Sequence, residues 1–99
     1  MLSINKNIDN GKAVFCLEGR LDTITAPELE KSLQESIEGV KSLVFDFGNL
    51  EYISSAGLRV ILAAQKLMTG KGEMKVCNLN ETVKEIFEVT GFSDILTIE

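Results

Sequence analysis

Polar and apolar positions alternate at the start of the chain and then give way to short apolar runs and helical patterns. Residues 2–8 alternate, and the Asn10-Gly11 pair that follows indicates a tight hairpin turn, because both residues tolerate positive φ angles. Residues 13–17 are apolar on both faces, as in a buried strand. We therefore expect the first two strands to pair as an antiparallel hairpin.

Further along the chain, apolar residues recur at helical spacing in three segments, which alternate with two short apolar runs typical of strands. Thr25 is expected to cap the first helix, with Glu28 completing a capping box. The predicted elements after the hairpin are a helix from residue 26 to Gly39, a strand over 43–47, a connection over 48–54, a helix over 56–68, a strand over 74–77, a helix between Asn80 and Gly91, and a last short strand or coil over 95–98.

The order of these elements predicts an α/β fold. Strand–helix–strand repeats require crossover connections, which give parallel strands, whereas the hairpin makes the β-sheet mixed. About three to four helices should pack on this mixed sheet. Because no linker or low-complexity segment divides the sequence, we expect residues 1–99 to form a single domain.

The composition is that of an ordinary globular protein, and the charge narrows the classes of partner. Of the 99 residues, 44% are hydrophobic and 25% are charged, and the net charge is −5. An acidic chain without a basic cluster is repelled by nucleic acid and by anionic membrane surfaces. The first ten residues do not resemble a signal peptide, and the apolar segment 56–68 is too short to span a bilayer. We therefore expect a cytoplasmic protein that binds neither nucleic acid nor membranes.

Residues suited to catalysis or metal binding are scarce. The chain has no histidine, no Gly-Lys-Ser/Thr phosphate loop, no Gly-x-Gly-x-x-Gly motif and no Gly-x-Ser-x-Gly motif. Cys16 and Cys77 each lie in an apolar, strand-like run, so we interpret them as reduced core thiols. A disulfide between them would require neighbouring strands. The sequence therefore predicts a protein that is not an enzyme and holds no metal ion or cofactor.

The most informative segment is Ile-Ser-Ser-Ala-Gly-Leu over residues 53–58, at the start of the second helix. Either Ser54 or Ser55 can cap that helix by accepting a hydrogen bond from a free amide. Gly57 either packs against a neighbouring backbone or leaves room for another surface to approach the serine. The helix is apolar over more than one stripe, which indicates either deep burial or an interface.

A phosphate on Ser55 would be tolerated at this place, because free amides and the helix dipole make the start of a helix electropositive. The modification would add about −1.5 to −2 charges and would disrupt an apolar or acid-sensitive interface.

Several short motifs resemble those of the anti-sigma-factor antagonist family, whose members are STAS domains. Each motif is weak by itself, but their order and spacing extend over nearly the whole chain. The matching segments are Glu18-Gly19-Arg20-Leu21-Asp22, Ala26-Pro27, Tyr52-Ile53-Ser54-Ser55-Ala56-Gly57-Leu58, Gly72-Glu73-Met74 and Thr90-Gly91-Phe92.

The resemblance implies a switch between partners that phosphorylation controls. In this family, the unphosphorylated antagonist binds an anti-sigma factor that is also a serine kinase, and the sigma factor is released. The kinase, whose site holds the ATP and magnesium, phosphorylates the antagonist, and a serine phosphatase restores the binding form. Counted from Gly57, the family's phosphoserine corresponds to Ser55. Ser54 then stands where other members often carry aspartate, and Ala56 where they often carry Ser or Thr.

The resemblance also implies which residues form the partner-binding face. They are Asp22, Ser54, Ser55, Gly57, Leu58 and Arg59. For Asp22, capping or turn formation before the first helix is an alternative role. Two other functions stay open: a STAS subunit of another assembly, such as a lipid-transport ATPase complex, with Ser55 only a helix cap, and a small nucleotide-hydrolysing enzyme.

Overall fold

The N-terminal hairpin forms as predicted. The computed structural model describes residues 2–94 and 96–99, and its first two strands, β1 (Leu2–Asp9) and β2 (Lys12–Leu21), pair antiparallel. Asn10 and Gly11 connect them with φ angles of 49° and 80°. Both angles are left-handed, as a two-residue hairpin turn requires.

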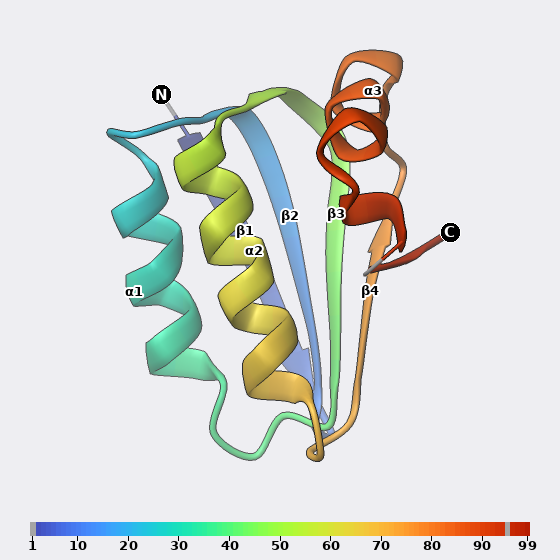
Figure 1. The fold of residues 1–99 in the computed structure, drawn as a ribbon. Helices are drawn as coiled ribbons and strands as arrows, with labels where there is room; N and C mark the ends of the chain where they lie inside the picture. Colours follow the sequence, from blue (N-terminus) through green and yellow to red (C-terminus); the bar gives the residue numbers. More distant parts are fainter. Residues whose placement is uncertain (1, 95) are drawn as a thin grey trace.

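The later strands join the sheet one after another on the same side. The strand order is β1-β2-β3-β4-β5, and β2 to β5 are all parallel. Each crossover is right-handed and adds the next strand on the same side of the previous one. All three α-helices therefore lie on one face of the sheet (Figure 1). This mixed sheet with three helices confirms the predicted fold class. The remaining elements are α1 (Ala26–Ser36), β3 (Ser42–Ile53), α2 (Ser55–Met68), β4 (Glu73–Cys77), α3 (Glu81–Thr90), the 3-10 helix η1 (Phe92–Asp94) and β5 (Thr97–Ile98).

The core lies between the helices and the sheet. Phe45 on β3 lies between Phe15 and Phe47, with ring centroids 5.7 and 6.0 Å away. Phe47 in turn meets Phe87 of α3 edge to face at 6.1 Å. All four rings are fully buried, so α3 is fixed to the same core as α1 and α2.

Burial accounts for most of the apolar character of α2. Leu67 and Ala63 reach the surface, and Leu67 is 41% exposed. The buried residues of the helix are Gly57, Leu58, Val60, Ile61, Ala64 and Met68.

β3 is longer than the sequence indicated, and the predicted connection over 48–54 is wrong. The Asp46 carboxylate accepts a hydrogen bond from the Gly48 amide at 2.9 Å, and the pairing of β3 with β2 shifts register twice beyond this point. The irregularity interrupts the alternation of apolar residues. Leu50 and Ile53 are therefore buried without continuing the pattern that identifies a strand.

The interpretation of the two cysteines as core thiols is also wrong. Both lie on the sheet face opposite the helices, which we call the open face; Cys16 is exposed and Cys77 is half-buried. Each pairs in register with Asp46, which lies between them on β3. Since two strand spacings separate their Cα atoms by about 10 Å, a disulfide would exceed its limit of about 7 Å. Their apolar sequence neighbours point the other way, into the core.

The element ends follow the predicted caps in part. Asn80 caps α3, its Oδ1 accepting a hydrogen bond from the Val83 amide at 2.8 Å, and Gly91 ends the helix with a φ of 81°. α1 ends at Ser36, before the expected Gly39. β5 provides the last strand, although Ile95 lies outside the described residues. Within the described ranges, the helices are too short or too polar to cross a lipid bilayer.

Candidate functional site

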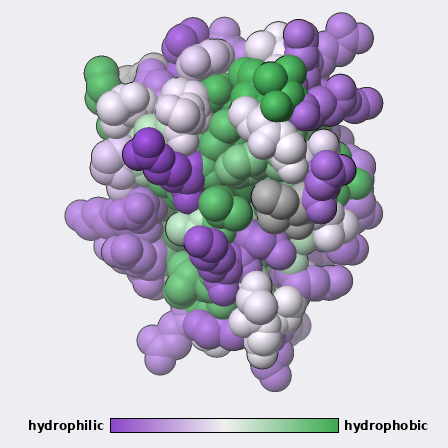
Figure 2. Space-filling model, in the orientation of Figure 1, coloured by the Kyte–Doolittle hydropathy of each residue, from purple (hydrophilic) through white to green (hydrophobic). Residues whose placement is uncertain are grey.

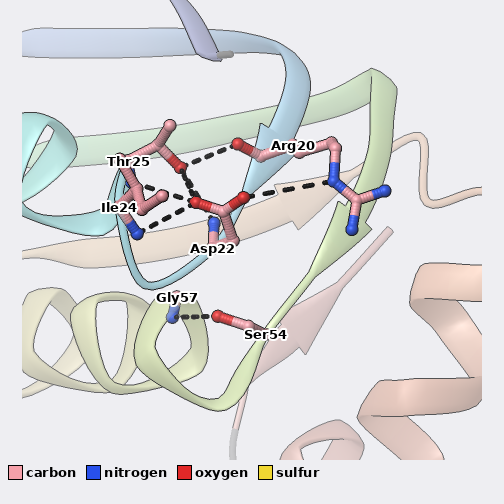
Figure 3. A network of polar contacts seen from close by, with 6 residues as sticks. All are labelled: Arg20, Asp22, Ile24, Thr25, Ser54 and Gly57. Carbon is pink, nitrogen blue, oxygen red and sulfur yellow. Dashed lines mark hydrogen bonds and ion pairs between the residues drawn. The ribbon is translucent and has the colours of Figure 1, made fainter.

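The carboxyl ends of β2 and β3 bring two predicted functional segments together. Because the strands are parallel, the turn after β2 and the start of α2 after β3 lie at the same edge of the sheet. The Ser54 amide donates a hydrogen bond to the Leu21 carbonyl at 2.8 Å, which joins the segments directly. Figure 3 shows the turn around Asp22 facing the first turn of α2.

Ser54 provides the cap of α2. Its backbone is extended, with φ −97° and ψ 175°, and its hydroxyl accepts a hydrogen bond from the Gly57 amide at 3.4 Å (Figure 3). Ser55 is the first residue of the helix, and it is exposed. Within residues 2–94 and 96–99, the Ser55 hydroxyl forms no hydrogen bond. It is therefore accessible to another molecule.

The surroundings of Ser55 favour a negative group. The first turn of α2 contains no acidic residue, and its free amides carry the positive end of the helix dipole. Arg59 is exposed and follows Ser55 by four residues, which places both side chains on one side of the helix, one turn apart. Helical side chains lean towards the N-terminus, so the stem of Arg59 extends in the direction of Ser55.

Gly57 and Leu58, which we expected on the binding face, lie in the core. Gly57 is buried, and Leu58 is only 5% exposed. A Cβ atom on Gly57 would lie 2.7 Å from Cγ of Leu21 and 2.9 Å from Cγ1 of Ile53. Of the two explanations for this glycine, close packing inside the protein is the one that its contacts support. Both residues support the site from the core and are not part of its exposed surface.

Asp22 organises the turn between β2 and α1. Its Oδ1 accepts hydrogen bonds from the amides of Ile24 and Thr25, both at 3.0 Å (Figure 3). The Thr25 hydroxyl accepts a hydrogen bond from the Asp22 amide at 2.8 Å, and it can donate to the Arg20 carbonyl at 2.8 Å or to Oδ1 of Asp22 at 3.1 Å. The Thr25 amide is the largest of the influences that hold the pKa of Asp22 below its ordinary value of 3.8.

The expected capping box of α1 is therefore wrong. The Thr25 side chain is buried and makes no capping hydrogen bond, because its hydroxyl is engaged within the turn. Asp22 fills the alternative role of a turn-forming residue with one carboxylate oxygen. Its other oxygen lies 4.0 Å from Nε of Arg20.

Two features of this edge were missed by sequence reasoning. Ile24, at the tip of the turn, is 83% exposed, and an apolar residue between two threonines in a predicted turn could have indicated this. The guanidinium carbon of Arg20 lies 4.6 Å above the ring centroid of Tyr52. That contact depends on the register of β2 and β3, which no local pattern indicates.

The site is a surface with one shallow hollow. The hollow, of about 210 Å³, separates the turn from α2, with Thr23 and Pro27 on one side and Ala56 and Arg59 on the other. This volume is below the range of about 300–1,000 Å³ typical of small-molecule sites. Across the part of the chain that the structure describes, no three His, Cys, Asp or Glu side chains are grouped to hold a metal ion.

Comparison with known sequences gives the chain several relatives. The family model described as the STAS domain matches residues 3–99. The chain is 40% identical over 91 residues to BtrV of Bordetella bronchiseptica, provisionally named an anti-sigma factor antagonist, with 90% of this chain and 78% of BtrV covered. It is 32% identical over 100 residues to the anti-sigma F factor antagonist of Paenibacillus polymyxa, with 98% and 86% covered.

Solved structures share the fold at low sequence identity. An anti-sigma factor antagonist from Mycobacterium paratuberculosis superposes with a TM-score of 0.90 at 20% identity, over 99% of this chain and 85% of that one. SpoIIAA in its unphosphorylated form gives 0.78 at 17% identity, over 98% and 87%. The phosphorylated form of SpoIIAA from Bacillus gives 0.77 at 17% identity, over 98% and 91%.

Proposed function

Because the chain belongs to the STAS domain family, we propose that it is an anti-sigma factor antagonist whose binding is switched by phosphorylation of Ser55. The observation that carries this proposal is that two adjacent serines have different structural roles. Ser54 caps α2, which leaves the Ser55 hydroxyl exposed and unbonded among the described residues.

In the unphosphorylated state, the chain binds an anti-sigma factor that is also a serine kinase, and the sigma factor is released. The proposed binding face consists of Ser55, Arg59 and the half-buried Asp22 and Ser54, with Gly57 and Leu58 supporting it from the core. The chain acts as a substrate and a binding partner and is not itself an enzyme. Sigma factors act in transcription, so we place this switch in the cytoplasm.

Phosphorylation joins Ser55 Oγ to the γ-phosphorus of ATP and breaks the bond between that phosphorus and the β,γ-bridging oxygen. ADP leaves, and the serine proton passes to a base of the partner. ATP and its magnesium ion belong to the partner's active site. A serine phosphatase later hydrolyses the phosphoester and restores the hydroxyl.

The phosphate blocks binding through charge. It adds about −1.5 to −2 charges at a surface that would otherwise be desolvated against the partner. The electropositive start of α2, together with Arg59 one turn on, stabilises the phosphate without unfolding the helix. Because SpoIIAA is known in both an unphosphorylated and a phosphorylated form, a protein of this fold can carry the modification.

The test combines phosphorylation with mass spectrometry. The purified chain is incubated with candidate anti-sigma kinases and magnesium ATP, and the modified residue is located by peptide mapping. We expect one phosphate on Ser55 in the wild type and in Ser54→Ala, and none in Ser55→Ala. A phosphate found only outside Ser54 and Ser55 would overturn the assignment.

The binding half of the proposal needs a second measurement. Ser55→Ala should stay bound to the kinase in the presence of ATP, whereas Ser55→Asp should bind poorly. Equal affinity of the two variants would count against a switch based on charge.

A further inference from the structure

A projecting apolar side chain borders the proposed Ser55 site. Ile24 is 83% exposed at the tip of the β2–α1 turn. Figure 2 shows hydrophobic surface at the upper left, where Figure 1 places the β2–α1 turn. Single exposed apolar residues are common, so the meaning of this one depends on how it is held and what lies beside it.

The turn that presents Ile24 is held in one conformation. The amides of Ile24 and Thr25 donate to the Asp22 carboxylate at 3.0 Å, and the Ala26 amide donates to the Asp22 carbonyl at 2.8 Å. The buried Thr25 side chain ties the turn to the Arg20 carbonyl of β2. Docking through Ile24 would therefore order little additional backbone, and most of the gain from burial would appear as affinity.

The turn that carries Ile24 and the start of α2 that carries Ser55 border the same shallow hollow. Thr23, directly before Ile24, lines the shallow hollow together with Ala56 and Arg59 of α2. Ala56 follows Ser55 directly. A protein surface that covers the hollow therefore comes close to both Ile24 and Ser55, each of which is one position away from a lining residue. The residues at the tip, Thr23 to Thr25, carry no charge, so docking there desolvates no ionised group of the tip.

We propose that Ile24 is the apolar anchor by which the chain docks onto its anti-sigma factor, beside the Ser55 switch. The inference rests on the proposed function and adds a requirement for the partner, namely an apolar pocket next to its phosphoryl-transfer site. A lipid surface is a poorer occupant, because the net charge of −5 is repelled by anionic lipids and one side chain inserts too little apolar area.

Affinity and switching are thus assigned to different residues. Full burial of an isoleucine side chain corresponds to about a ten- to hundred-fold change in affinity. Ile24 contributes this affinity each time the unphosphorylated chain binds its partner. The phosphate on Ser55 opposes binding by repulsion. Removing the anchor should weaken binding without altering the hydroxyl that accepts the phosphate.

The experiment measures the affinity of Ile24→Ser for the anti-sigma kinase that phosphorylates the wild-type chain. Val89→Ser is the matched control, because Val89 is 80% exposed on the outer side of α3, away from the site. We expect Ile24→Ser to weaken binding about ten- to hundred-fold and Val89→Ser to bind like the wild type. Ile24→Leu should retain binding, and equal thermal unfolding of the variants would show that all of them fold.

A kinetic readout separates anchoring from chemistry. Ile24→Ser should raise the KM of the kinase for the chain and leave kcat unchanged, since the environment of the Ser55 hydroxyl is intact.

The binding measurements distinguish failure of the anchor from failure of the proposed function. If Ser55→Asp loses binding while Ile24→Ser binds like the wild type, the proposed role of Ile24 is wrong and the proposed function stands. If Ser55→Asp binds like Ser55→Ala, the proposed function itself fails. A change in the sedimentation of the isolated chain caused by Ile24→Ser would assign Ile24 to self-association and overturn the inference.

Discussion

The Ser54 hydroxyl accepts a hydrogen bond from the Gly57 amide at 3.4 Å, so the cap of α2 comes from the serine next to the proposed phosphorylation site. A helix needs only one such cap, and Ser55 at the first helical position is left exposed. Structural and regulatory roles are thereby divided between neighbouring residues of the same type.

This division predicts different stabilities for two alanine variants. Ser54→Ala should lower the free energy of unfolding by about 0.5–1 kcal/mol, because an amide of the first turn loses its acceptor. Ser55→Ala should change it by less than about 0.5 kcal/mol, because the side chain is exposed. Urea denaturation measures both values. A larger loss in Ser55→Ala than in Ser54→Ala would show that the cap has been assigned to the wrong serine.

Gly57→Ala should destabilise the protein although alanine is the better helix former. The added Cβ would lie 2.7 Å from Leu21 Cγ and 3.0 Å from the Leu21 carbonyl oxygen, so β2 or α2 must shift. Overpacking of this kind costs about 1–3 kcal/mol, and the gain of about 1 kcal/mol in helix propensity offsets part of this cost, which leaves a net loss of about 0–2 kcal/mol. Guanidinium denaturation gives the net effect. Ala63→Gly, at an exposed position of the same helix, calibrates the propensity alone, and a stabilised Gly57→Ala would refute the close packing.

The lowered pKa of Asp22 makes part of the stability depend on pH. The folded state keeps the carboxylate ionised to lower pH than the unfolded state does, for which the ordinary value is 3.8. The stabilisation is therefore complete above that value and is lost as the pH falls through the lower pKa of the folded state. Asp22→Asn should have a lower Tm than the wild type at neutral pH, and this difference should shrink in acid below about pH 4.

Thermal unfolding across the pH range tests this expectation. Glu30→Gln, which removes an exposed acid from α1, serves as the control for a general change in net charge. A difference in Tm between the wild type and Asp22→Asn that is the same at every pH would contradict the role of the ionised carboxylate.

The two thiols on the open face should react at different rates. Burial, followed by the charge of Asp46, raises the pKa of the Cys77 thiol, which leaves less of the reactive thiolate at neutral pH. Cys16 is exposed and should react first with an aromatic disulfide reagent. Two kinetic phases are expected, of which Cys16→Ser removes the fast one and Cys77→Ser the slow one. A single phase in the wild type would be inconsistent with the different environments.

The candidate site could be predicted in part from local motifs. Asp22, Ser54, Ser55 and Arg59 do lie at one edge of the sheet, because parallel strands place the segments that follow them side by side. The motif could not indicate that Gly57 and Leu58 are buried beneath that edge, since their exposure depends on how closely α2 approaches Leu21 and Ile53. Ile24 has no periodic pattern around it, and only its place between two threonines in the turn indicates its exposure.

The amino-acid sequence by itself determined the hairpin, the alternation of strands and helices, and the cap and end of α3 at Asn80 and Gly91, because each depends on residues a few positions apart. Only the tertiary structure decided that β3 continues through an irregular register to Ile53 and that the cysteines face away from the core. These properties depend on which strands pair and which face the helices cover. Contacts between residues distant in sequence set them, and no local pattern records such contacts.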